Sequence, residues 1–330
     1  MTDPALVAVV IAATLGFAFT NGFHDASNSV ATAVTTRALT PAAAIALAAT
    51  MNAVGALLST RLALLVGFGL VDPPTGRSGL LLVLAGVLGA TLWNLLTWWH
   101  GMPSSSSQAL IAGLAGATLL APGMLDGAAI ALQVAVPMLL SPVLGFLLAW
   151  LGMAAVTRLR AERDYSATVR GFRYAQTLSG AALALGHGLQ DAQKSMGVIL
   201  LALSLAGGDH DAALPWAVVS CAGALAAGTA AGGWRVTRTL SRRITAIDPP
   251  RGFVAEAVSA LLLAVSALAF RVPASTTHTV TSSIVATGVH RGVRSVRWRT
   301  VGRIALTWLI TPFAAAVFAA ILRVLLLPFG

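Results

Sequence analysis

Two short motifs place ionisable side chains inside apolar stretches of the chain. NGFHDASN at 21–28 contains Asp25, and HGLQDAQK at 187–194 contains Asp191 and, three residues later, Lys194, the only lysine of the protein. A charge at membrane depth costs at least a few kcal/mol, so a carboxylate in such a place usually marks the path of an ion or a charged substrate. These residues therefore predict a buried site for ions.

Two further motifs are rich in hydroxyl groups, and each begins with a proline. Proline suits the first turn of a helix and serine or threonine its cap, so PSSSS at 103–107 and PASTT at 273–277 predict helix starts. A helix N-terminus carries about half a positive charge and several unpaired N–H donors, which makes it a binding site for anions. The candidate residues for an anion are Ser104, Ser105, Ser106, Ser107, Ser275, Thr276 and Thr277.

The charges of these motifs do not balance if an anion binds alone. Asp25 and Asp191 contribute two negative charges and Lys194 one positive charge, and an oxyanion adds more negative charge. The site becomes neutral only if cations or protons bind with the anion, as in a symporter. Carboxylates that accept hydrogen bonds also suit an anion that carries its own proton, such as hydrogen phosphate, whereas they would repel sulfate.

The composition is that of an integral membrane protein. Of the 330 residues, 57% are hydrophobic and 10% are charged, and the mean hydropathy is +0.84. The apolar runs are continuous and rich in Ala, Leu and Gly, which favours an all-α polytopic fold over a β-barrel. A helix needs about 20 residues to cross a bilayer, and the runs predict about ten transmembrane helices, or twelve if long runs are split into hairpins. The runs are 5–36, 42–70, 79–99, 104–120, 128–157, 177–207, 213–233, 253–271, 275–289 and 303–327.

The first of these runs contains a glycine just before its carboxylate. Glycine is where a helix most readily breaks and exposes backbone groups to a ligand. We therefore expect 5–36 to form two half-helices with a break near Asn21 to Asp25. Broken or hairpin helices of this kind would lie at the centre of the molecule.

Positive charge is concentrated in three short connections, so the net charge of +10 indicates membrane topology rather than nucleic-acid binding. By the positive-inside rule these connections are cytoplasmic, which places both termini outside a cytoplasmic (inner) membrane. The two halves of the chain then run in opposite directions, which predicts two inverted-topology repeats. The connections are 158–173, 235–251 and 291–303, and the predicted units are a first repeat at 1–157, a basic cytoplasmic linker at 158–175 and a second repeat at 176–330.

The motifs support the repeat. Aligning NGFHDASN with HGLQDAQK pairs Asp25 with Asp191 and Asn28 with Lys194. The interval from the aspartate to the proline of the hydroxyl-rich motif is 78 residues in the first half and 82 in the second. Two motifs in one order at nearly one spacing are hard to obtain by chance, so the four motifs predict one central site built from both halves.

With these residues the sequence resembles the inorganic phosphate transporter (PiT) family in its bacterial form. NGFHDASNSVATAVTTRALTP and HGLQDAQKSMGVILLAL resemble the two signature repeats of the family, and PSSSSQALIAGLAG and PASTTHTVTSS resemble its paired hydroxyl-rich segments. The resemblance covers nearly the whole chain. It implies a secondary active symporter, not an enzyme, that imports inorganic phosphate with a coupling cation by alternating access.

Carried over by position, the resemblance implies a role for each polar residue of the motifs. Lys194 joins the seven hydroxyl residues in holding phosphate. The resemblance implies coupling to a proton, to sodium at Asp25, Asn28 and Asp191, or to a metal ion that is carried as a complex with phosphate. No other cofactor is implied. The residues implied in cation or proton coupling are Asn21, Asp25, Asn28 and Asp191. His24, next to Asp25 in the sequence, is either a titrating group of the same site or a histidine that packs between helices.

The sequence departs from the family pattern at three positions. Gln108 stands where the family usually has a histidine that pairs with His278, and Ala112 and Ser282 replace common glycines. The missing histidine weakens the expectation of a paired-histidine function. The missing glycines weaken the expectation of close helix packing at the hydroxyl-rich segments.

Several alternatives stay open at this stage. A sulfate or other oxyanion permease on the same scaffold is the second hypothesis, and a membrane-embedded enzyme acting through both aspartates is disfavoured because no third catalytic group occurs at matching spacing. Lys194 is a candidate substitute for a bound cation because it aligns with Asn28. Glu256, three residues into its apolar run, either belongs to the ion path or reaches the membrane interface. The Ala- and Gly-rich spans would also allow a homodimer.

Overall fold

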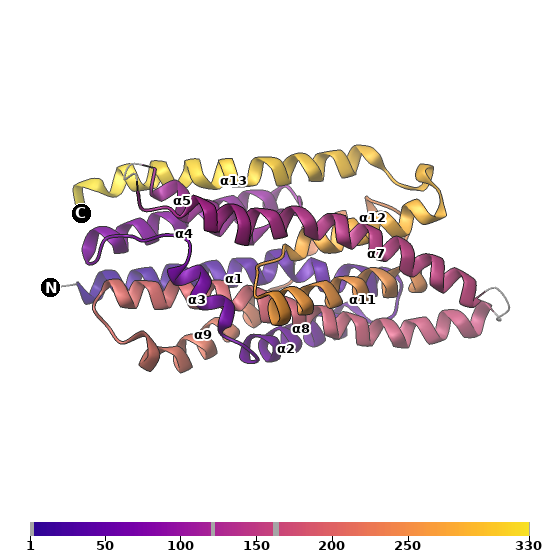
Figure 1. Ribbon diagram of the computed structural model, residues 1–330. Helices are drawn as coiled ribbons and strands as arrows, with labels where there is room; N and C mark the ends of the chain where they lie inside the picture. The colour runs from indigo at the N-terminus through magenta and orange to yellow at the C-terminus, as the bar shows by residue number, and fades with distance from the viewer. Residues whose placement is uncertain (1–2, 120–122, 161–164, 330) are drawn as a thin grey trace.

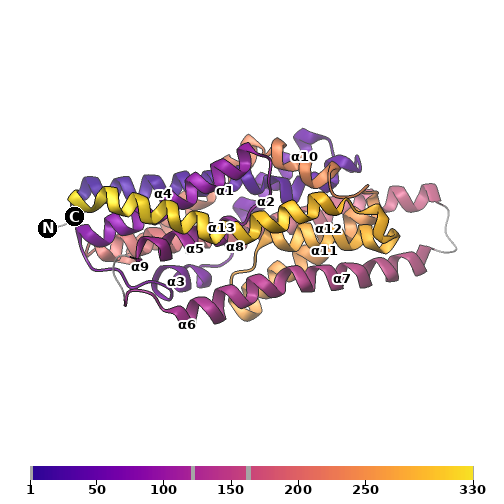
Figure 2. The same ribbon diagram turned by 90° about the horizontal axis from the view of Figure 1, so that it is seen from above.

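The computed structural model describes residues 3–119, 123–160 and 165–329, which form an elongated bundle of helices (Figure 1, Figure 2). Within these ranges no strand forms, and one isolated bridge joins Val71 to Leu125. The predicted all-α membrane fold is confirmed.

The helices of the first half begin at capping residues. The side chains of Asp3 and Thr40 accept hydrogen bonds from backbone N–H groups at the starts of the first two helices, and a proline occupies the first turn of each. The second and third helices meet at a bend of 76°. The elements are α1 (Pro4–Thr35), α2 (Pro41–Leu57), α3 (Arg61–Phe68), α4 (Arg77–Trp99), α5 (Ser106–Ala117), α6 (Gly127–Ala129), the π-helix η1 (Ile130–Ala135) and α7 (Val136–Arg160).

The second half repeats the order of helices seen in the first. In each half a long helix is followed by a pair of consecutive shorter helices, then by a helix–turn–helix unit, and then by another long helix. This order agrees with the predicted internal repeat, whose inversion stays a prediction. The elements are α8 (Tyr165–Leu205), α9 (His210–Ala231), α10 (Trp234–Arg242), α11 (Pro249–Val265), the π-helix η2 (Ser266–Phe270), α12 (Thr276–Arg291), η3 (Val293–Ser295), α13 (Trp298–Leu326) and η4 (Leu327–Phe329).

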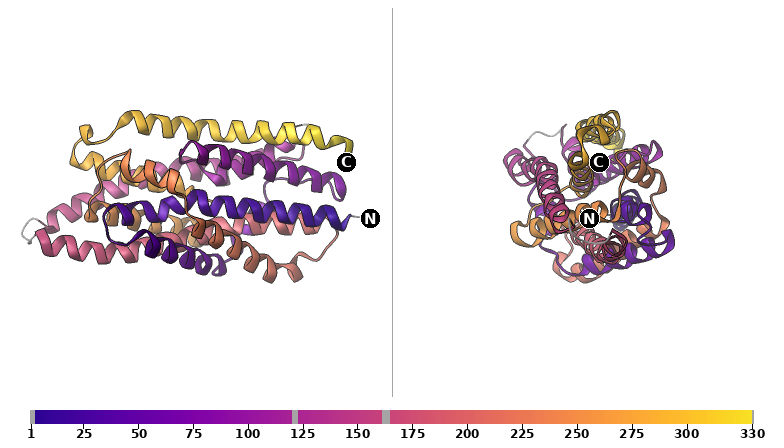
Figure 3. Two further views of the ribbon diagram at one scale, coloured as in Figure 1. Left: turned by 180° about the vertical axis from the view of Figure 1, so that it is seen from behind. Right: turned by 90° about the vertical axis from the view of Figure 1, so that its right-hand side faces the viewer.

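The two ends of the chain lie at the same end of the bundle. The start of α1 and the end of α13 are neighbours there, whereas α7 ends and α8 begins at the opposite end (Figure 3). This arrangement agrees with the prediction that both termini share one side of the membrane, opposite the basic connection at 158–173.

Two of the predicted spans are too short to cross a membrane. α5 has 12 residues and α12 has 16, which at about 1.5 Å per residue gives roughly 18 and 24 Å, against a hydrocarbon thickness of about 30 Å. Each packs against the longer helix that precedes it, α4 or α11. We call these units hairpin 1 (α4 to α5, with its tip at 100–105) and hairpin 2 (α11 to α12, with its tip at 271–275).

Length and composition alone identify fewer spans than the ten to twelve predicted. Among the described helices, six are long and apolar enough to cross a membrane, or seven if the bent pair α2–α3 is one span. α8 has 41 residues but is not among the six, because a run of polar residues occupies its middle. These residues are His187, Gln190, Asp191, Gln193 and Lys194.

The predicted break in α1 is wrong, since the helix is continuous from Pro4 to Thr35. Gly22 serves close packing instead: a Cβ there would lie 2.2 Å from the carbonyl oxygen of Leu225 on α9. Gly188 has the same effect on α8, where a Cβ would lie 2.0 Å from the carbonyl oxygen of Asn52 on α2. The two glycines therefore bring neighbouring helices close to the polar stretches of α1 and α8.

Gly22→Ala is expected to lower the stability of the protein by about 1–3 kcal/mol, because the added methyl group forces α1 away from α9. Gly16→Ala is the matched control on the same helix, since a Cβ at Gly16 has no neighbour within 4 Å. The measurement is the apparent melting temperature in detergent. Equal melting temperatures for the two variants would show that the α1–α9 contact tolerates a side chain.

The predicted linker at 158–175 is mostly helical. α7 extends to Arg160 and α8 begins at Tyr165, and residues 161–164 lie outside the described part of the chain. Arginine and alanine, which are common in this stretch, favour helix, so the helices continue beyond the apolar runs. The division into repeats at 1–157 and 176–330 stays a prediction.

Candidate functional site

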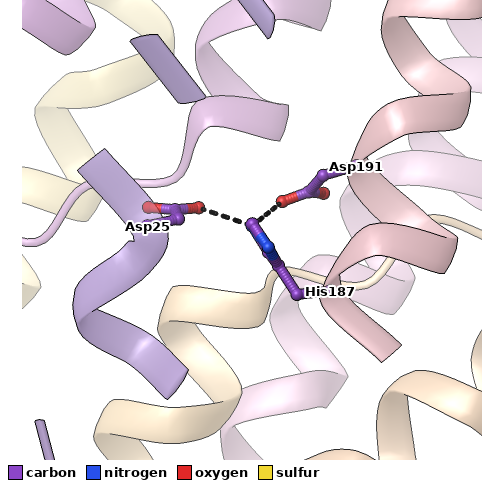
Figure 4. A group of neighbouring side chains, drawn as sticks. All are labelled: Asp25, His187 and Asp191. Carbon is purple, nitrogen blue, oxygen red and sulfur yellow. Dashed lines mark ion pairs between the residues drawn. The ribbon is translucent and has the colours of Figure 1, made fainter. Parts of the chain in front are cut away.

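Asp25 of α1 and Asp191 of α8 meet at the centre of the bundle, and His187 of α8 points between them (Figure 4). Nε2 of His187 lies 2.7 Å from Oδ2 of Asp191 and 3.7 Å from Oδ2 of Asp25. All three side chains are buried, and one ligand atom from each lies within 4.8 Å of the others. The structure therefore brings the two predicted acids together in an arrangement that can hold a metal ion.

His187 is a site residue that the sequence reasoning missed. Two signals were available: His187 lies one helical turn before Asp191, and it aligns with Asn21 when the two motifs are superimposed. Residues four apart share one face of a helix, so a histidine at this position necessarily faces the same neighbours as Asp191.

The ring of His187 has a defined orientation. Its Nδ1 lies 3.1 Å from Oδ1 of Asn52, whose amide group donates to Oγ1 of Thr229 at 2.7 Å. The Thr229 hydroxyl donates in turn to the carbonyl of Leu225 at 2.9 Å, so the Asn52 oxygen must accept from Nδ1–H of His187. In a neutral ring Nε2 would then turn a lone pair toward two carboxylates. This repulsion is relieved only if Nε2 carries a proton or a cation lies between the three groups.

Lys194 joins the acid cluster to hairpin 1. Its Nζ donates to Oδ1 of Asp191 and to Oγ of Ser107, the second residue of α5. Only 1% of the lysine is exposed. A buried ammonium group needs such partners, and the contact places a positive charge beside the hydroxyl-rich helix start.

His24 joins Asp25 to the tip of hairpin 1. Its Nδ1 lies 2.7 Å from Oδ1 of Asp25, and its Nε2 lies 3.2 Å from both Oγ of Ser104 and Oγ1 of Thr97. Those two hydroxyls are also within 2.8 Å of each other. Thr97 lies at the end of α4, so this network connects α1 with both sides of the tip.

Hairpin 2 reaches the same cluster from the other side. Oγ1 of Thr277 donates to Oδ1 of Asp25 at 3.4 Å and accepts from the amide of Asn28 at 3.1 Å. The predicted residues of the second hydroxyl-rich motif and of the first acidic motif are therefore in direct contact.

Ser105 and Ser275 act as helix caps. Each hydroxyl oxygen accepts a hydrogen bond from the backbone N–H three residues later, at 3.3 Å in both helices. This is ordinary capping, and it occurs at corresponding positions of α5 and α12.

The first residues of the two capped helices have unused polar groups. The hydroxyls of Ser106 and Thr276 are buried and have no hydrogen-bond partner among the described residues. The same is true of the side-chain oxygens of Asn21 and Asn28 on α1. Buried polar atoms are normally paired, so these four atoms are available to a ligand, a water molecule or an ion.

Glu256 is buried, with 1% of the residue exposed, and does not reach the interface. Its Oε1 accepts hydrogen bonds from Oγ1 of Thr32 and, at 3.1 Å, from the amide of Gln176, while Oε2 accepts from Oγ of Ser179 at 2.6 Å. The carboxylate therefore ties α11 of hairpin 2 to α1 and α8. Snorkelling, one of the two expectations for Glu256, is wrong.

Glu256→Leu is expected to destabilise the protein by about 3 kcal/mol, because it leaves three buried donors without an acceptor. Glu256→Gln should lower the stability of the protein by a smaller amount, since the glutamine amide keeps one acceptor oxygen. The apparent melting temperature in detergent compares the two variants. A leucine variant as stable as the glutamine variant would mean that the three hydrogen bonds contribute nothing to stability.

Ala112 and Ser282 do not prevent close packing of the hydroxyl-rich helices. The side chain of Ser282 fits against α7 because α7 has a glycine, Gly145, at the contact. A Cβ on Gly145 would lie only 2.7 Å from Oγ of Ser282. Next to Ala112, a Cβ on Gly113 would lie 2.4 Å from the carbonyl oxygen of Gly86 on α4. Close packing is therefore kept without glycine at 112 and 282, because neighbouring glycines allow the close approach.

A family model described as "Phosphate transporter family" matches residues 21–319 of the chain. Proteins called probable low-affinity inorganic phosphate transporters are similar over nearly the whole chain. The protein of Mycobacterium bovis is 43% identical over 320 residues, which cover 95% of this chain and 76% of that protein. The protein of Bacillus subtilis is 38% identical over 323 residues, which cover 96% of each chain.

A solved structure of a protein called "The sodium-dependent phosphate transporter" has the same fold. The TM-score is 0.87 at 21% sequence identity, and the match covers 98% of this chain and 99% of that one. The helical arrangement is therefore shared even where most residues differ.

Proposed function

The chain belongs to the phosphate transporter family, and from this premise we propose that it is a secondary active symporter that imports inorganic phosphate with a cation by alternating access. One observation carries the proposal. A continuous row of buried contacts joins the two hairpins through both acids. It runs from Ser107 to Lys194, Asp191, His187, Asp25 and Thr277.

Phosphate binds, in this proposal, between the starts of α5 and α12. Ser106 and Thr276 offer buried hydroxyls without partners in the described part of the chain, and the two helix N-termini add backbone N–H groups and positive partial charge. Lys194 supplies a full positive charge next to Ser107. The remaining candidates, Ser104, Ser105 and Ser275, shape the helix starts through their hydrogen bonds.

The coupling cation binds at Asp25, Asn28 and Asp191. The carboxylates face Nε2 of His187 in a geometry that requires a positive charge, and the side-chain oxygen of Asn28 has no partner among the described residues. Sodium at these oxygens, or a proton on the cluster, supplies that charge. The structural neighbour is called sodium-dependent, which makes sodium the first cation to test on this chain.

The topology follows from the charge distribution. We place the basic end of the bundle, where α7 ends and α8 begins, in the cytoplasm, so that both termini lie outside the inner membrane. Residues 1–157 and 176–330 then form two repeats of opposite orientation, and hairpins 1 and 2 enter the membrane from opposite sides. Alternating access would expose the central site past one hairpin at a time.

Uptake of labelled phosphate into proteoliposomes tests the proposal. Sodium, proton and magnesium gradients are imposed one at a time, with protein-free liposomes as the control. We expect one gradient to accelerate uptake and a large excess of sulfate to leave it nearly unchanged. Uptake that no gradient drives would contradict symport, and uptake that sulfate abolishes would favour the oxyanion permease.

A further inference from the structure

Trp308 of α13 contacts the tip of hairpin 1 and the first turn of α12, next to the tip of hairpin 2. Its Nε1–H donates a hydrogen bond of 3.0 Å to the carbonyl oxygen of Pro103, in the tip of hairpin 1. The face of the same ring stacks on His278, in the first turn of α12, with ring centroids 4.1 Å apart and an interplanar angle of 34°. One half-buried side chain therefore touches both units that carry the hydroxyl-rich motifs.

The helices around Trp308 belong to two packing groups. α13 packs along α4 and α5 of hairpin 1, whereas α12 packs along α7 and α11. The two groups meet through side chains, because Ile304 of α13 shares a hydrophobic cluster with Val280 and Ile284 of α12. The stack of Trp308 on His278 thus extends the contact between these two groups of helices to the start of α12.

The two contacts lie close to the unpaired hydroxyls. Pro103 is three residues before Ser106, and His278 is two residues after Thr276. Nδ1 of His278 also lies 3.5 Å from the carbonyl oxygen of Met138 on α7, so its ring lies between α7 and α13. A shift of either tip would move one of these hydroxyls and break one contact to Trp308.

We propose that Trp308 is a positioning residue that holds both hairpin tips closed over the central site. Its two contacts use different parts of the indole: the edge N–H binds hairpin 1 and the ring face binds hairpin 2. Either tip can therefore be released while the other stays attached. The inference rests on the proposed function and deepens it, since closure of both tips would enclose the transported anion.

The test measures how accessible each tip is to a thiol reagent. Cys221 is the only cysteine and is buried, so a Cys221→Ser background allows single probes at Met102→Cys, in the tip of hairpin 1, and Ala274→Cys, in the tip of hairpin 2. Trp308→Phe keeps a ring that can stack but removes the donor. Trp308→Leu removes both contacts.

We expect Trp308→Phe to raise the labelling rate at Met102→Cys by about fivefold to tenfold, the effect of losing one hydrogen bond, and to leave Ala274→Cys unchanged. Trp308→Leu should raise labelling at both probes. Trp298→Phe is the matched control, because it removes an indole hydrogen bond of 3.0 Å, to the carbonyl of Val293, at the start of the same helix. It should change neither rate.

Unchanged labelling in both Trp308 variants would overturn the proposal. So would an equal increase at both probes in Trp308→Phe, because that result indicates general loosening rather than the loss of one tip contact. The labelling is done in detergent without phosphate, so it does not depend on transport. A protein that shows the expected labelling but no phosphate uptake would refute the proposed function and leave the role of Trp308 intact.

Discussion

Asp25→Asn is expected to lower phosphate uptake about 100-fold and to remove its dependence on the coupling cation. Neutralising one partner of a buried charge cluster costs about 3 kcal/mol, which corresponds to a factor of roughly 100. Asp25 faces His24, His187 and Thr277 at once. Its loss takes away the negative charge that attracts the cation, so the anion would have to bind without the positive charge that the cation brings to the site.

The measurement is binding of cation and phosphate by calorimetry, together with uptake into proteoliposomes. Asp211→Asn is a suitable control, because the Asp211 side chain is 86% exposed near the start of α9 and should tolerate the change. Both variants should elute as folded protein. If Asp25→Asn kept cation-dependent phosphate binding, Asp25 would not be part of the coupling site.

Lys194→Asn is expected to make phosphate binding about tenfold weaker at low cation concentration and to restore it at high concentration. The substitution removes the ammonium that contacts Asp191 and Ser107, and an unpaired buried carboxylate is costly by several kcal/mol. An additional cation can replace the lost charge. The dependence of binding on cation concentration should therefore become steeper, by one cation for each phosphate.

Lys194→Arg is the control for the loss of charge, since it keeps a cation at the same position and should keep the original cation dependence. Phosphate binding is titrated at several cation concentrations for the three proteins. An unchanged dependence in Lys194→Asn would show that Lys194 does not replace a bound cation.

Several features of the site were predictable because they are local. The ten apolar runs correspond to helical segments, since a helix satisfies its backbone hydrogen bonds within itself where no water is available. Ser105 and Ser275, which each lie two residues after a proline, cap α5 and α12, since capping involves residues only a few positions apart. The alignment of Asp25 with Asp191 suggested one shared site, and the two carboxylates lie around one histidine.

Other features depend on contacts between segments that are far apart in the sequence. Whether Gly22 breaks α1 or lets α9 approach cannot be decided without knowing that Leu225 lies against it. Whether α5 crosses the membrane or returns depends on its packing against α4 and α13. Hydropathy measures only how apolar a segment is and carries no information on packing. The apolar runs that contain α5 and α12 were therefore predicted as transmembrane spans.

Residue type and spacing alone specify the membrane-embedded helical class, the four polar motifs and their pairing, and the charge imbalance from which a coupling cation is predicted. Each of these properties belongs to a short segment or to a count of charges, so no knowledge of packing is needed. The packed bundle was required to show that His187 lies between the two acids, that Lys194 reaches Ser107, and that Trp308 touches both hairpins. The partners in these contacts lie on different helices or are set by the orientation of a ring, so the contacts arise only when the helices pack together.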